Sequence, residues 1–221
     1  SSQGGLKGLS MPDVSESRTL PPFHTIELDG VGTIVFNQAQ SQSFQLEGPD
    51  SHVAAISAEV IDGVLIISTE SRTIRIMNSG LVPRYIVSAP TLRKLTISGA
   101  GRAEIGELRT ESITIAVDGA GDVRLPKLQV DHCQVTIGGA GNVRAAGIAM
   151  RQEIAIVGTG NFSGDELVGE SVHVSIAGAG RAKVHATADL RAEIGGVGQI
   201  SYLGDPKVHS EITGLGRIKR A

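Results

Sequence analysis

The stretch LTISGAGRA (residues 95–103) decides the fold, because the same phrase returns six more times along the chain. Each copy has two apolar residues separated by one position, then two glycines separated by one residue, then a polar residue; in the last copy Ser210 takes the first apolar position. The other copies are IAVDGAGDV (115–123), VTIGGAGNV (135–143), IAIVGTGNF (154–162), VSIAGAGRA (174–182), AEIGGVGQI (192–200) and SEITGLGRI (210–218). The first glycines are spaced 20, 20, 19, 20, 18 and 18 residues apart. Such a period predicts a solenoid with one supersecondary unit per turn.

The apolar residues before the glycines alternate with residues of the opposite face, which is the period of a β-strand. The glycine spacing leaves no room for the helices of an α-solenoid. We therefore predict that each repeat is a strand, a glycine bend, a second strand and a short returning segment. Stacking the repeats places one apolar ladder inside the solenoid, formed by Ile97, Val117, Ile137, Ile156, Ile176, Ile194 and Ile212.

The glycine pairs mark the predicted bends. Glycine permits sharp bends, including positive φ angles that a Cβ atom penalises. The expected structural turns lie at Gly99, Gly101, Gly119, Gly121, Gly139, Gly141, Gly158, Gly160, Gly178, Gly180, Gly196, Gly198, Gly214 and Gly216.

The repeated phrase, preceded by a non-repetitive β segment, resembles the bacterial family called the putative autotransporter-adhesin head GIN domain. The resemblance covers about residues 20–219 and rests on the seven repeats. It implies a single-stranded β-helix whose glycine pairs form tight turns between sheets. It also implies an adhesive role, which in that family is not tied to a set of catalytic residues.

The chain divides into three parts by composition and pattern. Residues 1–22 are rich in Ser, Gly and Pro and are expected to form a flexible leader; residues 93–221 carry the β-helix repeats, of about seven coils. Between them, residues 23–92 alternate like strands without repeating, and Gly30 and Gly32 form an isolated relative of the later pairs. We predict that this part caps the solenoid, because an open end coil exposes unpaired backbone groups, or that it forms a β-sandwich-like lobe fused to the solenoid. At the other end, the charges of Lys219 and Arg220 could discourage pairing of the last strand edge with another chain. The alternative is that this edge packs against a second subunit in a homo-oligomer.

Composition limits the classes of partner. The 221 residues carry a net charge of −3, and no basic stripe is evident along the chain, so nucleic acid is not an expected partner. No apolar run reaches 18 residues, so no membrane span is expected. The chain opens at Ser1 rather than Met, and we expect that an export signal has been removed and that the protein lies in the cell envelope, in the periplasm, at the outer membrane or outside the cell.

No catalytic or metal site is predicted. The glycine pairs lack the third glycine and the helix of a dinucleotide-binding motif, and a period near 20 does not match calcium-binding nonapeptide repeats. Spacings of 19 and 20 also break the register of hexapeptide acyltransferases, and the acidic residues are scattered. His132 and the single cysteine, Cys133, are neighbours in a strand and so point to opposite faces. We expect no cofactor, no metal and no enzyme.

One polar column could bind a partner. The residue after each glycine pair is polar, and stacking would bring these residues together on one edge as a contact strip for a glycan or a protein: Arg102, Asp122, Asn142, Asn161, Arg181, Gln199 and Arg217. The alternative is that they only face water where the turn ends. The prediction is therefore a non-enzymatic, adhesin-head-like contact or scaffold module of the cell envelope. The alternative function is a β-helix protein that binds or cleaves polysaccharide.

Overall fold

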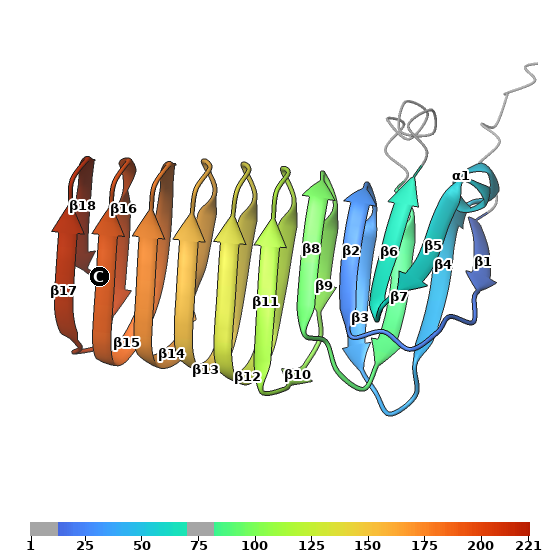
Figure 1. The fold of residues 1–221 in the computed structure, drawn as a ribbon, viewed down its shortest axis with the longest axis horizontal. Coiled ribbons are helices and arrows are strands. Elements are labelled where there is room, and N and C mark those ends of the chain that lie inside the picture. Colours follow the sequence, from blue (N-terminus) through green and yellow to red (C-terminus); the bar gives the residue numbers. More distant parts are fainter. Residues whose placement is uncertain (1–12, 70–81) are drawn as a thin grey trace, which may run out of the picture.

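The computed structural model describes residues 13–69 and 82–221, which form a long stack of β-strands with one short helix (Figure 1). The helix is α1 (Asp50–Ala54). The strands are β1 (Asp13–Ser17), β2 (Thr25–Gly30), β3 (Thr33–Gln38), β4 (Ser43–Pro49), β5 (Ile56–Ile61), β6 (Val64–Thr69), β7 (Arg84–Ala89), β8 (Lys94–Gly99), β9 (Arg102–Ile105), β10 (Leu108–Arg109), β11 (Ser112–Val117), β12 (Asp122–Ile137), β13 (Asn142–Ile156), β14 (Asn161–Ile176), β15 (Ala179–Ile194), β16 (Val197–Leu203), β17 (Lys207–Ile212) and β18 (Leu215–Arg220). The predicted all-β solenoid is confirmed, and its seven glycine pairs delimit about six turns.

The stack has two parallel walls joined at the glycine bends. The front sheet contains β8, β11, the later halves of β12 to β15, and β17. The back sheet contains β9, the earlier parts of β12 to β15, β16 and β18. A short third side returns the chain, beginning where β10 pairs with Leu128 and Gln129. Each long strand therefore runs down the back wall, turns through the third side and rises in the front wall.

The isolated glycine pair near the N-terminus belongs to the same stack. β2 pairs with β8, and this register places Gly30 beside Gly99, while β3 pairs with β9. β2 also pairs with β6, and β3 with β7, so the unit 25–38 lies between the remaining N-terminal strands and the first repeat.

The N-terminal strands close this end of the stack as a mixed sheet. β4 pairs antiparallel with β7 and with β1, and β5 and β6 form a hairpin at Asp62 and Gly63. Both of these turn residues have positive φ, 50° and 78°, as the Asp-Gly signal predicts for a two-residue hairpin. β1 lies within the stretch expected to be a leader, and residues 1–12 of that stretch lie outside the described residues.

Close backbone stacking explains the repeated glycines. The sharp bends lie at the glycine pairs as expected, but from Gly119 onward the paired glycines have φ angles outside the left-handed range. Instead, a Cβ on Gly139 would overlap the carbonyl oxygen of Gly119 in the preceding coil, and the same overlap recurs at Gly158, Gly178, Gly196 and Gly214. The bend also continues the backbone ladder, because the Ala140 amide donates to the Gly119 carbonyl at 3.1 Å.

The predicted apolar ladder lies between the two walls. Strand pairing aligns Ile97, Val117, Ile137, Ile156, Ile176, Ile194 and Ile212 in one register. All of these residues are buried except Ile212, which is 44% exposed because its coil is covered on one side only. The alternation of small β-branched residues with outward polar ones therefore sets both the core and the outer faces.

Candidate functional site

The predicted contact strip is one continuous column on the outer surface of the back sheet. Strand pairing places its members side by side in the order Arg102, Asp122, Asn142, Asn161, Arg181, Gln199, Arg217. The Asn142 side-chain amide donates to Asp122 Oδ1 at 3.1 Å, and that of Asn161 donates to Asn142 Oδ1 at 3.0 Å. Arg102 lies 3.7 Å from the Asp122 carboxylate. Coil-to-coil hydrogen bonds thus hold the middle of the strip in a fixed arrangement.

A second outward column lies beside the strip, two residues further along each strand. Its register gives Glu104, Arg124, Arg144, Ser163, Lys183, Ser201 and Lys219. We call this set the basic column. Sequence reasoning missed it, although the two-residue period of a strand places each member on the same face as the strip.

Together the two columns form a basic surface, which corrects the expectation that the chain has no basic stripe. They contain seven cationic side chains and two carboxylates, a local charge of +5 on a chain whose net charge is −3. The cations come from five different coils, so most of them are brought together only when the coils stack. The cations are Arg102, Arg124, Arg144, Arg181, Lys183, Arg217 and Lys219.

Most of these cations lack a carboxylate partner. Arg102 is near Asp122, but within residues 13–69 and 82–221 none of the other six has a carboxylate oxygen within 4.0 Å. Arg124 and Arg144 are direct neighbours on adjacent strands. Like charges directly opposite each other destabilise a sheet, so this arrangement has a cost that the fold itself does not require.

The matching columns of the front sheet are different. The register there aligns Lys94, Thr114, Gln134, Glu153, His173, Arg191 and His209, and beside them Thr96, Ala116, Thr136, Ala155, Ser175, Glu193 and Glu211. These two columns contain two cationic side chains, Lys94 and Arg191, and three carboxylates. Arg191 lies 2.7 Å and His173 3.5 Å from Glu193. Burial alone would raise the pKa of Glu193, but the hydrogen bond and charge of Arg191, with a smaller effect of His173, hold that pKa below its ordinary value. With two cations and three carboxylates these two columns carry a charge of −1, and the Arg191 cation is paired with Glu193.

Shallow hollows run along the back sheet over the basic column. One of about 520 Å³ is lined by residues that include Arg124, Arg144, Ser163, Arg181 and Lys183. A hollow of about 590 Å³ follows at Ser201, and the two share Arg181 and Lys183. A third, of about 560 Å³, extends the row toward β3 and shares Arg124 and Arg144. We call this row of hollows the back-sheet groove.

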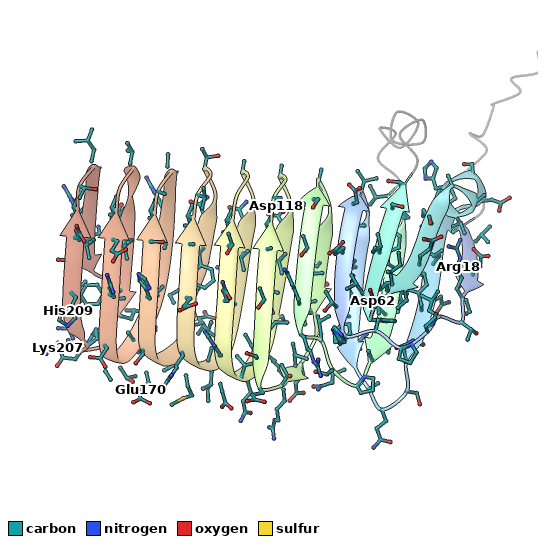
Figure 2. All side chains as sticks on the ribbon, viewed as in Figure 1. Arg18, Asp62, Asp118, Glu170, Lys207 and His209 are labelled. Carbon is teal, nitrogen blue, oxygen red and sulfur yellow. The ribbon has the colours of Figure 1, made fainter. Side chains whose placement is uncertain are left out.

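The titratable residues of the part that the structure describes form no metal-binding cluster. Within the described ranges, no group of three or more His, Cys, Asp or Glu side chains is placed to hold a metal ion. Cys133 is fully buried, and burial raises the pKa of its thiol to about 12, so the thiol stays protonated at neutral pH. Its neighbour His132 is partly exposed and lies 3.9 Å from Glu153. Figure 2 places Asp118 beside the glycine bends and Glu170 at the opposite end of the coils, so these carboxylates do not converge.

The fold and the repeated glycine bends are those of a known family. The family model described as "Putative auto-transporter adhesin, head GIN domain" matches residues 22–206. The chain belongs to this family. The resemblance drawn from the seven repeats is therefore confirmed. No sequence among curated proteins matches the chain.

Solved structures show the same architecture over nearly the whole chain. A protein of Bacteroides fragilis described as a putative adhesin is 28% identical, with a TM-score of 0.90 over 96% of this chain and 98% of its own. A protein of Parabacteroides distasonis described as a putative lipid binding protein is 19% identical, with a TM-score of 0.73 over 95% and 96%. A putative adhesin of Parabacteroides merdae is 18% identical, with a TM-score of 0.68 over the same shares. The last two comparisons support the fold.

The part of the chain that the structure describes contains no helix of the length and apolar character needed to cross a membrane.

Proposed function

We propose that this protein is a non-enzymatic contact module of the cell envelope, which attaches to a surface through the outer face of its back sheet. The observation that carries the proposal is the back-sheet groove, which continues over several coils and is lined by unpaired cations and a hydrogen-bonded polar strip. Membership of a family described as adhesin heads supports an adhesive role and a location in the envelope.

The geometry of the back-sheet groove suits binding to an extended surface better than catalysis. A catalytic site needs acid, base or nucleophile groups with converging positions and tuned pKa values. Along the groove the side chains instead repeat from coil to coil, and repetition offers a long surface of similar subsites. Backbone ladders between coils keep this surface straight, so a weak contact at one coil adds to the contact at the next.

The test is retention of protein-coated beads on bacterial envelopes and on host-cell surfaces under flow, with albumin-coated beads as the control. Released reducing sugar ends are measured in the same chamber. We expect retention above the control without release of sugar ends. Release that depends on the protein would instead support polysaccharide cleavage, and retention no better than albumin on every surface would contradict a contact role.

A further inference from the structure

We propose that the back-sheet groove binds a linear acidic polysaccharide lying along the solenoid axis, with Arg124, Arg144, Arg181 and Lys183 holding its carboxylates. This inference rests on the proposed contact function and names the chemical class of its ligand. Four observations support it: the unpaired cations, their spacing, the polar strip beside them, and the absence of aromatic side chains from the strip and the basic column.

The unpaired cations give the groove a preference for anions. Arg124 and Arg144 are adjacent in register, and parallel strands are separated by about 4.8 Å. A carboxylate between two guanidinium groups would relieve their repulsion and accept charge-assisted hydrogen bonds from both. The matching columns of the front sheet have the same backbone, but they carry two cations and three carboxylates where the back-sheet columns carry seven and two. This preference therefore belongs to the side chains of one face and not to the solenoid in general.

The spacing of the cations fits an extended polymer. In the basic column Ser163 lies between Arg144 and Lys183, and Ser201 lies between Lys183 and Lys219. Each serine is short, so a hollow opens above it with a cation on either side. The cations from Arg144 onward therefore recur at every second strand, roughly 10 Å apart, which is twice the strand spacing. A regular row of this kind fits a chain with regularly repeated charges.

The neighbouring strip fits the hydroxyl groups of sugars. Side-chain amides both donate and accept hydrogen bonds, as hydroxyl groups do. Asn142 and Asn161 lie beside Arg144 and Ser163, and both line the same hollow. Phosphate oxygens only accept hydrogen bonds, so a polyphosphate could not donate to the side-chain oxygen of Asn161, whereas a sugar hydroxyl group could.

The side chains that the groove lacks argue against a nucleic acid strand. Proteins that hold single strands generally stack bases on aromatic side chains. In the described part of the chain, the strip and the basic column contain no Phe, Tyr or Trp. Phe162 lies between the columns in sequence but is 1% exposed, with its ring in the core.

The experiment measures binding of the whole chain to polygalacturonate by titration calorimetry. The back-sheet variant is Arg124→Gln, Arg144→Gln and Lys183→Gln together. The matched control is Lys94→Gln, Arg151→Gln and Lys207→Gln, which removes three exposed cations from the front sheet and changes the net charge equally. Circular dichroism and thermal unfolding check that both variants keep the fold. Fully methyl-esterified polygalacturonate, a thymidine oligonucleotide and inorganic polyphosphate are compared as ligands.

We expect the original chain to bind polygalacturonate, and both the back-sheet variant and the esterified polymer to weaken binding at least tenfold. The front-sheet variant should stay within twofold, and added salt should weaken binding because it screens exposed charges. Equal weakening by both variants, equal binding of the esterified polymer, tighter binding of the oligonucleotide or polyphosphate, or no binding of polygalacturonate would each overturn the inference.

The bead assay separates this inference from the proposed function. If the folded back-sheet variant is retained on surfaces as well as the original chain, the groove cations are not needed and the polysaccharide inference fails while the contact role stands. If retention and polygalacturonate binding are lost together in the back-sheet variant but kept in the front-sheet variant, both proposals are supported.

Discussion

The repeated coils and the N-terminal strands solve the same packing problem in different ways. In the coils every strand is parallel to its neighbour, and one solution is repeated with the same residue types at the same positions. The N-terminal part combines parallel and antiparallel pairs and fills its core with aromatic side chains, among them Phe23, Phe36, Phe44 and Tyr85. The coils therefore need the same residue type at the same position of every repeat, whereas the fold of the N-terminal part depends on individual contacts.

The strictest requirement of the coils is the absent side chain at the bends. In Gly139→Val the new side chain would overlap the backbone carbonyl oxygens of Gly119 and Asp118 in the preceding coil. The Gly119 oxygen accepts the ladder hydrogen bond from Ala140 and cannot move without breaking it. We therefore expect the free energy of unfolding to fall by about 4 kcal/mol or more, among the largest effects of single substitutions. Urea denaturation followed by circular dichroism measures it.

Ala140 is the control for this prediction, because it lies between the two glycines of the same bend and is exposed. Ala140→Val should change stability by only about 0.5 kcal/mol. Equal effects of the two substitutions would show that bulk at the bend, and not contact between coils, decides stability.

The next prediction compares the two cores directly. Phe36 and Ile137 are both fully buried, one in β3 and the other in the ladder of the coils. We expect Phe36→Ala to cost about 3 to 5 kcal/mol and Ile137→Ala about 2 to 5 kcal/mol, whereas Ile212→Ala should cost less, because Ile212 is 44% exposed.

Because β2 and β3 pair with β8 and β9, the two regions share one continuous ladder. Both core variants should therefore unfold in a single transition, with thermal and urea curves shifted as a whole. Two resolved transitions in Phe36→Ala would instead separate the N-terminal strands from the coils as independent units.

Sequence reasoning performed well where the chain repeats. The alternation before each glycine pair predicted the strands, and the spacing predicted the column from Ile97 to Ile212 and the register of the polar strip. It attributed the glycines to the freedom of their own backbone, because the close approach of Gly139 to Gly119 is a contact between coils that local sequence does not reveal. The basic column was missed although stacking and the two-residue period of a strand predict it as they predict the strip, because only the residue directly after each glycine pair was considered.

The N-terminal part was less predictable. The Asp62-Gly63 turn is local and was recognised. The place of β2 between β6 and β8, and of β3 between β7 and β9, depends on pairing between distant segments. Gly30 and Gly32 carried the signal that this unit resembles a repeat. No further copy lies next to it in sequence to show which coil it would join.

A smaller effect is expected at the buried hydroxyl group of the N-terminal core. Tyr85 is fully buried, and its hydroxyl group donates to the Val31 carbonyl at 2.8 Å. Tyr85→Phe keeps the ring but leaves that carbonyl without this donor, so we expect a loss of about 1 to 2 kcal/mol by urea denaturation. A neutral result would mean that water replaces the hydroxyl group at Val31 and that ring packing alone holds this position.

The smallest effect should come from the paired charges on the outer face of the coils. The pKa of Glu193 is held below its ordinary value by Arg191, so the charged carboxylate favours the folded state. This contribution is complete above the pKa of the unfolded chain, about 4.3 for glutamate, and is lost as the pH falls through the lower pKa of the folded state. We therefore expect Glu193→Gln to cost about 0.2 to 1 kcal/mol at pH 7 and nothing near pH 3.

Urea denaturation of both proteins at the two pH values, with Arg191→Gln and the double variant completing the cycle, measures this difference. A difference that persists at pH 3 would assign the effect to side-chain shape and not to charge. Because even the Arg191–Glu193 pair is expected to add so little, we expect the stability of the coils to come from their backbone hydrogen bonds, their apolar core and their glycine bends. Unpaired cations on the back face can then be replaced without unfolding the stack, so a loss of binding there reports on the groove itself.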